Sequence, residues 1–118
     1  MKKWKPIAIE NSEVPVWVSK LTGINAWAVS FFIFIFCVAK FDDSVRQHET
    51  IHFQQQLELL FVFQWILYGL FWLIGLIKYR SRQQAYLRNP FEQEAYDHQD
   101  IPNYLLCRKR YSWWKYKI

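Results

Sequence analysis

Two histidines and a glutamate stand in the pattern HExxH, at His48, Glu49 and His52. On an α-helix, residues four apart lie about 40° from each other around the axis, so both imidazoles point to one side and can share a metal ion. The pattern is typical of zinc metallopeptidases, in which the ion activates a water molecule and the glutamate takes its proton. We therefore expect His48 and His52 to bind one Zn²⁺, and Glu49 to act as the general base without binding the ion.

The alternative is an amphipathic helix whose two histidines are merely hydrated. The neighbours of the pattern carry no charge: Gln47, Thr50, Ile51 and Phe53. An uncharged surround favours a buried metal helix over a hydrated one. Zinc is the default ion for two histidines and a carboxylate, although iron uses the same ligands.

A catalytic zinc site needs a third protein ligand. The stretch NPFEQEAYDH, residues 89–98, resembles the second helix of the gluzincins, the HExxH metallopeptidases whose third ligand is a glutamate on a later helix. Many gluzincins place that glutamate three residues before an alanine, so the resemblance implies Glu92, which stands three before Ala95. Glu94 is the rival ligand. Tyr96 stands where the family often has Asp or Asn.

Two blocks, HETIHFQQQLE at 48–58 and NPFEQEAY at 89–96, together resemble a set of small bacterial membrane-associated zincin-like proteins of uncharacterised activity. The resemblance covers roughly residues 25–98. It implies a minimal gluzincin core, made of a strand, the metal helix, a connection and the helix with the third ligand. It implies no particular substrate.

Other polar residues near these blocks are candidates for supporting roles. Gln56 lies one helical stripe beyond the two histidines. It is expected either to orient an imidazole or a backbone group next to the site, or to be a polar residue on the cleft side of the helix. Tyr96, His98 and Tyr104 are candidate hydrogen-bond donors to a reaction intermediate. Their spacing does not select among them. His98 is also the candidate for a fourth metal ligand, which would close the site.

The N-terminal region, residues 1–41, is expected to contain one or two strands. Val14–Val18 is a short β-prone run, and residues 24–38 are uncharged and rich in β-branched and aromatic residues. The second run predicts a buried strand or one strand of a hairpin. A short segment that dips into a membrane is the alternative interpretation of this second run.

Two helices should carry the ligands. The first, at 42–58, begins with three residues that favour an N-cap, Asp42, Asp43 and Ser44. Ser44 with Gln47 also has the spacing of a capping box. The second, at 89–99, begins at Asn89–Pro90. The predicted fold is therefore a single α+β domain over residues 1–118, mostly helical, with an apolar helical hairpin inserted between the two metal helices.

Residues 59–77 carry no charge and are long enough to cross a bilayer. One straight helix would advance the chain about 28 Å and put Glu92 on the opposite side from His48. Irregular backbone cannot return through hydrocarbon. We therefore expect a break near Tyr68–Gly69 and a hairpin that dips into one leaflet. A helix lying in the interface and a helix buried in the protein core are the alternatives.

Composition excludes disorder, because hydrophobic residues make up 53% of the chain and aromatic residues 20%. The net charge is +5, and the whole excess lies in residues 78–118. Basic residues mixed with Trp and Tyr in the tail, 104–118, favour an anionic lipid surface over nucleic acid or a hydrated tail. The positive-inside tendency then places the metal site and the tail on the cytoplasmic face.

Two functions remain open. The first is a membrane-associated zinc peptidase that acts on a peptide or membrane-protein substrate. The second is a metal-binding membrane protein without hydrolytic activity, for example a small subunit of a larger membrane complex. A carboxylate-bridged di-iron site is disfavoured, because Glu49 and His52 supply one Glu-x-x-His motif but Glu94 and His98 are one residue too far apart for the second.

Overall fold

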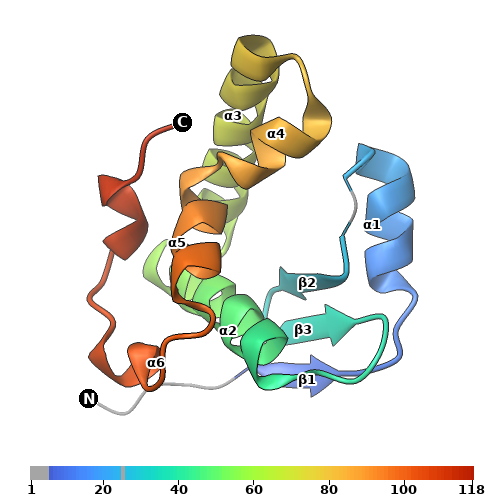
Figure 1. The fold of residues 1–118 in the computed structure, drawn as a ribbon, viewed down its shortest axis with the longest axis vertical. Coiled ribbons are helices and arrows are strands. Elements are labelled where there is room, and N and C mark those ends of the chain that lie inside the picture. The colour runs from blue at the N-terminus through green and yellow to red at the C-terminus, as the bar shows by residue number, and fades with distance from the viewer. Residues whose placement is uncertain (1–5, 25) are drawn as a thin grey trace.

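The computed structural model describes residues 6–24 and 26–118 and has an α+β fold that is mostly helical, as the sequence predicts (Figure 1). In chain order the elements are β1 (Ile7–Ile9), α1 (Val14–Thr22), β2 (Ala28–Phe31), β3 (Phe34–Cys37), α2 (Asp43–Glu58), α3 (Val62–Tyr79), α4 (Arg82–Leu87), α5 (Pro90–His98), α6 (Tyr104–Cys107) and the 3₁₀ helix η1 (Ser112–Lys115). Helix α2 contacts β2 and β3 of the small sheet and also contacts α3 and α5, so it joins the two parts of the molecule.

The sheet has the strand order β1-β3-β2, with β1 parallel and β2 antiparallel to β3. A two-residue turn at Phe32 and Ile33 closes the β2–β3 hairpin, and Phe32 has a left-handed φ of 58° there. Residues Ile35 and Cys37 of β3 are fully buried. The single strand expected within 24–38 is instead a complete hairpin of two strands, and with β1 the sheet has three strands where one or two were expected.

Helix α1 corrects the expectation that Val14–Val18 is extended. Pro15 stands in the first turn, where its missing N–H costs no hydrogen bond. Gly23 ends the helix in the left-handed conformation at φ 73°, and its N–H donates to Ser19 O at 2.9 Å. These end signals outweigh the β propensity of the three valines in the first half of the helix.

Helix α2 covers the predicted range, and Asp42 is the one of the three expected N-cap residues that caps it. The side chain of Asp42 accepts a hydrogen bond from Val45 N at 2.8 Å. Ser44 instead donates to Asp100, and Gln47 donates to the backbone oxygen of His98 at 2.6 Å. The capping box expected from Ser44 and Gln47 is therefore wrong. Their side chains tie α2 to the end of α5.

Helix α3 is continuous through Tyr68–Gly69, so the break expected there is wrong. The helix ends at Arg80, which has a left-handed φ of 51°, and Ser81 caps α4 by accepting from Gln84 N. The chain then returns along α3 (Figure 1). The hairpin is made by α3 and the polar α4, with its turn at residues 80–81.

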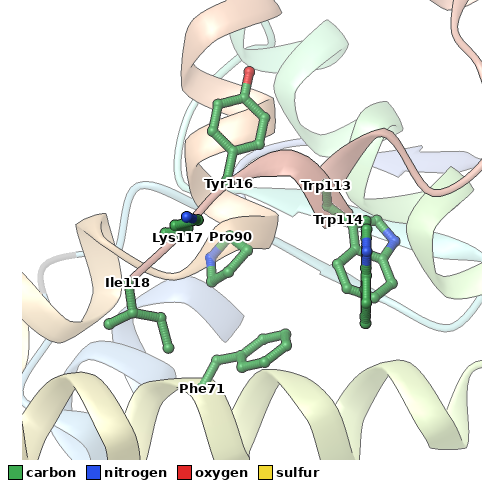
Figure 2. A pocket seen from close by; sticks show the side chains of 7 residues that line it. All are labelled: Phe71, Pro90, Trp113, Trp114, Tyr116, Lys117 and Ile118. Atoms are coloured by element: carbon green, nitrogen blue, oxygen red, sulfur yellow. The ribbon is translucent and has the colours of Figure 1, made fainter.

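The C-terminal tail is folded onto α5 rather than projecting as a basic arm. Trp113 is 3% exposed, and its ring centroid lies 4.7 Å from that of Phe91. Arg108 is also buried and forms ion pairs with Glu94 and Glu58. Figure 2 shows the apolar pocket of about 300 Å³ that the tail forms where it crosses α3 and the start of α5.

Candidate metal centre

The two histidines of the HExxH pattern lie one turn apart on α2 and are buried. Their Nε2 atoms are 3.2 Å apart. The rings are nearly perpendicular, with an interplanar angle of 77°. The helical spacing therefore brings the two imidazole nitrogens together, as expected for a shared ion.

Glu92 reaches both imidazoles from α5. Its Oε1 lies 3.0 Å from His48 Nε2 and 2.9 Å from His52 Nε2. Helix α5 is held in this position by Asn89, which caps it by accepting a hydrogen bond from Phe91 N, and by the fully buried Phe91 ring. We refer to His48, His52 and Glu92 as the His–Glu cluster.

Two glutamines fix the imidazole rings from behind. Gln99 Oε1 lies 2.8 Å from His48 Nδ1, and Gln55 Oε1 lies 2.8 Å from His52 Nδ1. The amide nitrogen of Gln55 donates to a backbone oxygen and a carboxylate oxygen of α5, which fixes the orientation of that amide. Each Nδ1–H therefore donates to an amide oxygen, and each Nε2 is turned toward the centre of the cluster.

The donor set fits a zinc ion. Ligand atoms of a tetrahedral Zn²⁺ with bonds of about 2.0–2.1 Å are about 3.3 Å apart. The three donor atoms of the His–Glu cluster are separated by 2.9, 3.0 and 3.2 Å. Shifts of a few tenths of an ångström would bring them to that spacing, and two imidazoles with one carboxylate are a common catalytic zinc set.

Glu49 lies beside the cluster and is 3% exposed. Its Oε2 is 3.9 Å from His48 Nε2. Burial raises the pKa of Glu49, and the charges of the two imidazoles offset part of that rise. A buried carboxylate at this distance is placed to exchange a proton with a water molecule at the cluster.

The charges of the cluster hold it together. Burial lowers the pKa of His52, but the negative charge of Glu92 and its hydrogen bond outweigh burial and raise that pKa to about 10. Burial likewise raises the pKa of Glu92, but the two imidazoles outweigh it and lower that pKa. A cationic His52 is thus paired with an anionic Glu92, and a metal ion that binds here must displace the shared proton.

Tyr68 is a site residue that the sequence analysis missed. Its hydroxyl donates to Glu92 Oε2 at 2.6 Å from the middle of α3. The only available signal was a hydroxyl within the apolar stretch 59–77. No periodicity relates a residue on that stretch to one on α5.

Glu94, the rival third ligand, contacts Gln55 and does not contact the imidazoles. Arg108 donates to both of its carboxylate oxygens, at 2.6 and 2.9 Å, and Tyr104 OH donates to Oε2 at 2.7 Å. Gln55 Nε2 donates to its Oε1 at 3.0 Å. The structure therefore brings Glu92, and not Glu94, to the two histidines.

Gln56 does not orient an imidazole, and of the roles expected for it the structure shows a contact with a backbone group instead. Its amide nitrogen donates to the backbone and hydroxyl oxygens of Ser30, both at 3.1 Å. Gln56 therefore ties α2 to β2. The orienting role predicted for it belongs to the preceding residue, Gln55, and to Gln99 of the loop after α5.

Among the three other polar candidates, Tyr96 alone contacts a histidine of the cluster. Its ring meets His48 edge-on at 4.4 Å, and its hydroxyl pairs with Tyr86 OH at 3.0 Å. His98 instead stacks on Tyr104 at 4.0 Å, and its Nδ1 donates to Glu94 O. His98 and Tyr104 therefore belong to the tail contact, and the structure does not place His98 as a fourth ligand.

No protein-family model, curated protein or solved structure matches this chain. What supports a function is therefore the arrangement of the chain's own residues. That arrangement consists of the His–Glu cluster, the buried carboxylate of Glu49 beside it, and the glutamine and tyrosine side chains that orient the ligands.

Proposed function

We propose that this chain is a membrane-associated zinc-dependent metallopeptidase. The observation that supports it most directly is the meeting of His48 Nε2, His52 Nε2 and Glu92 Oε1 within 3.2 Å of one another. These three atoms come from two helices that are separated in sequence by α3 and α4. The buried Glu49 beside them supplies the base that peptide hydrolysis needs.

Each residue has a separate task in this proposal. His48, His52 and Glu92 hold the ion, and bound Zn²⁺ supplies Lewis acidity that polarises a carbonyl and lowers the pKa of water toward about 7. Glu49 accepts a proton from the water whose oxygen adds to the peptide carbonyl carbon. As the C–N bond breaks, Glu49 returns that proton to the leaving amine nitrogen.

Helix α3 supports the membrane part of the proposal. Among the described residues it is the one helix long and apolar enough to cross a bilayer, with a mean hydropathy of 1.4. Only 11% of its residues are buried within the protein. A helix this apolar and this exposed needs a covering that water does not supply.

Metal content and cleavage together test the hydrolytic part. Zinc would be measured in the purified chain and in the variants His48→Ala, Glu92→Gln, Glu94→Gln and Glu49→Gln, with circular dichroism as the folding control. We expect His48→Ala and Glu92→Gln to lose zinc, and Glu94→Gln to keep it. Glu49→Gln should keep zinc and lose cleavage of a fluorogenic peptide mixture.

The second candidate is a metal-binding protein without hydrolytic activity, and the position of Glu49 favours it. Donor atoms of His48, Glu49 and His52 all lie within 4.8 Å of one another, so Glu49 is close enough to close the coordination sphere. If Glu49→Gln loses zinc as fully as His48→Ala, then Glu49 is a ligand, and the peptidase proposal fails in favour of this candidate.

A further inference from the structure

We infer that α3 lies in the plane of an anionic bilayer surface and docks the protein on one leaflet, without crossing it. The inference deepens the membrane part of the proposed function. It does not depend on zinc or on hydrolysis. Three observations support it: the two sides of α3 differ, α4 packs back along α3, and positive charge lies at the end of α3.

One side of α3 forms an apolar face. Six apolar side chains on this helix are at least half exposed: Val62, Phe63, Ile66, Leu70, Leu73 and Ile77. At 3.6 residues per turn they fall within about 100° of the circumference. Such a stripe normally faces a protein core, but here it faces outward along the whole helix.

The opposite side of α3 packs against the rest of the protein. Gln64 and Gly75 are buried there, and a Cβ at Gly75 would lie 3.0 Å from Ala85 Cα of α4. Tyr68 donates to Glu92 from the same side, and Asn89 Nδ2 donates to Tyr68 O at 3.1 Å. Lipid therefore has access to the outer side of α3 and not to its whole circumference.

The returning chain argues against a spanning orientation. Contacts of Ala85 with Gly75 and of Asn89 with Tyr68 show that α4 runs antiparallel beside α3, back to its middle. If α3 crossed a bilayer, the polar α4 and the charged His–Glu cluster would lie at the hydrocarbon centre. Charged groups at that depth are costly. With α3 in the plane, both remain on the water side.

Charge complementarity identifies the covering partner as anionic lipid. Lys78 and Arg80 are exposed at the C-terminal end of α3, directly after Ile77 of the apolar face. The excess of positive charge in the chain lies in residues 78–118. Basic side chains at the edge of an apolar helical face favour binding to anionic headgroups.

The orientation also defines the substrates within reach, if the proposed peptidase activity holds. Tyr68 contacts Glu92 from the side of α3 opposite the apolar face. A helix with its side chains is about 10–12 Å across. The His–Glu cluster therefore lies about one helix diameter above the lipid, and its substrates are peptide segments at the bilayer surface, not segments inside the hydrocarbon.

Vesicle flotation tests the docking face. The full chain would be floated with phosphatidylcholine vesicles, with and without phosphatidylglycerol. We expect Leu70→Gln with Leu73→Gln to lower the partition coefficient at least about tenfold. The control, Leu21→Gln with Leu106→Gln, changes two leucines outside α3 that are even more exposed, and it should leave the partition coefficient within about twofold.

A second vesicle measurement tests the basic residues at the end of the apolar face. Lys78→Gln and Arg80→Gln should each weaken binding to vesicles with phosphatidylglycerol about fivefold, and should not change binding to pure phosphatidylcholine. Equal loss on both kinds of vesicle would overturn the role assigned to anionic lipid.

Nitroxide depth measurements test the orientation. Labels would be placed singly at Phe63→Cys, Leu70→Cys and Ile77→Cys, in a Cys107→Ser background that leaves only the buried Cys37. An in-plane helix gives three similar depths, within about 5 Å. A spanning helix makes the middle label deeper than the outer two by about 10 Å, because seven residues advance about that far.

Other results separate this inference from the proposed function. His48→Ala and Glu49→Gln should float like the unchanged chain, so a failed zinc test leaves the inference standing. If the chain binds zinc and cleaves peptides but does not float, the docking face is wrong. A stable dimer that ignores vesicles and dissociates in the Leu70→Gln, Leu73→Gln variant would show that a second copy covers the face instead.

Discussion

The two carboxylate oxygens of Glu92 have different partners. Oε1 lies between the two imidazoles, and Oε2 accepts the hydrogen bond from Tyr68 OH. The tyrosine therefore holds the side chain in one rotation and leaves a single oxygen facing the histidines. Contacts of this kind behind a ligand typically affect metal affinity about 10–100-fold.

Removing the Tyr68 hydroxyl should weaken zinc binding without removing a ligand. We expect Tyr68→Phe to lower zinc affinity about 10–100-fold, measured by competition with a chelator of known affinity. Tyr79→Phe is the control, because Tyr79 lies on the same helix and bonds Arg88 instead. Equal affinities for Tyr68→Phe and Tyr79→Phe would show that Tyr68 does not position Glu92.

Zinc uptake should release a proton at neutral pH. Glu92 raises the pKa of His52 to about 10 although burial lowers it, and a ligating imidazole nitrogen must be unprotonated. Apparent zinc affinity should therefore rise about tenfold per pH unit from neutral pH up to that pKa. Calorimetry in buffers of different ionisation enthalpy measures the proton count, and a count of zero at pH 7 would contradict the His52–Glu92 pairing.

At the scale of elements, α3 carries two glycines in opposite environments. No atom lies within 4 Å of a Cβ added at Gly69, whereas one added at Gly75 would lie 3.0 Å from Ala85 Cα. Gly75 therefore permits the close approach of α4, and that approach turns the chain back toward α2. Gly69 has no such role and only weakens the helix.

The two glycines predict opposite changes in stability. Gly69→Ala should raise the free energy of unfolding by about 0.5–1 kcal/mol, because alanine is the better helix former. Gly75→Val should lower it by about 1–3 kcal/mol, because α4 must move away. Urea unfolding measures both. A Gly75→Val variant as stable as Gly69→Ala would contradict the packing of α4 on α3.

At the scale of the whole molecule, one arginine ties the C-terminal tail to the metal helices. Arg108 is buried and donates to Glu94 of α5 and to Glu58 at the end of α2. Glu94 in turn accepts from Gln55, which orients His52. The tail is therefore connected to the candidate site through two hydrogen-bonded side chains.

Arg108→Leu should be among the more damaging single changes in the chain. It leaves two carboxylates without a cationic partner, at a cost of about 3–5 kcal/mol in the free energy of unfolding. Lys109→Leu, an exposed neighbour, should change it by less than about 0.5 kcal/mol. Similar unfolding curves for the two variants would show that the tail is not anchored at Arg108.

The ion pair of Arg108 and Glu94 also makes the free energy of unfolding of the unchanged chain fall at acid pH. Burial raises the pKa of Glu94, but the hydrogen bonds and charge of Arg108 outweigh it and lower that pKa below the ordinary 4.5. The contribution of the pair is therefore complete above pH 4.5 and is lost as pH falls through the lowered pKa. In Arg108→Leu the protonation of Glu94 should begin at higher pH, which unfolding curves between pH 3 and 6 would detect.

Local patterns in the sequence determined the helices that carry the site. The spacing of His48 and His52 brings two imidazoles together on any α-helix, and Asn89–Pro90 marks the start of α5. The fold class and the extended character of residues 24–38 were predictable for the same reason, because backbone geometry alone relates residues a few positions apart. That these residues form two strands and not one was not predicted. It was harder to rank the helix end signals against the β propensity of the valines, which is why α1 was predicted as extended.

Only the tertiary structure decided which distant side chains meet. Glu92 and Glu94 stand on different faces of one short helix, and the choice between them depends on how α4 returns along α3. Tyr68 reaches Glu92 from α3, and Arg108 reaches Glu94 from the C-terminal tail, so both contacts also depend on tertiary packing. Contacts between residues 14 to 44 positions apart depend on how the intervening segments turn and pack, and no repeating backbone geometry encodes them.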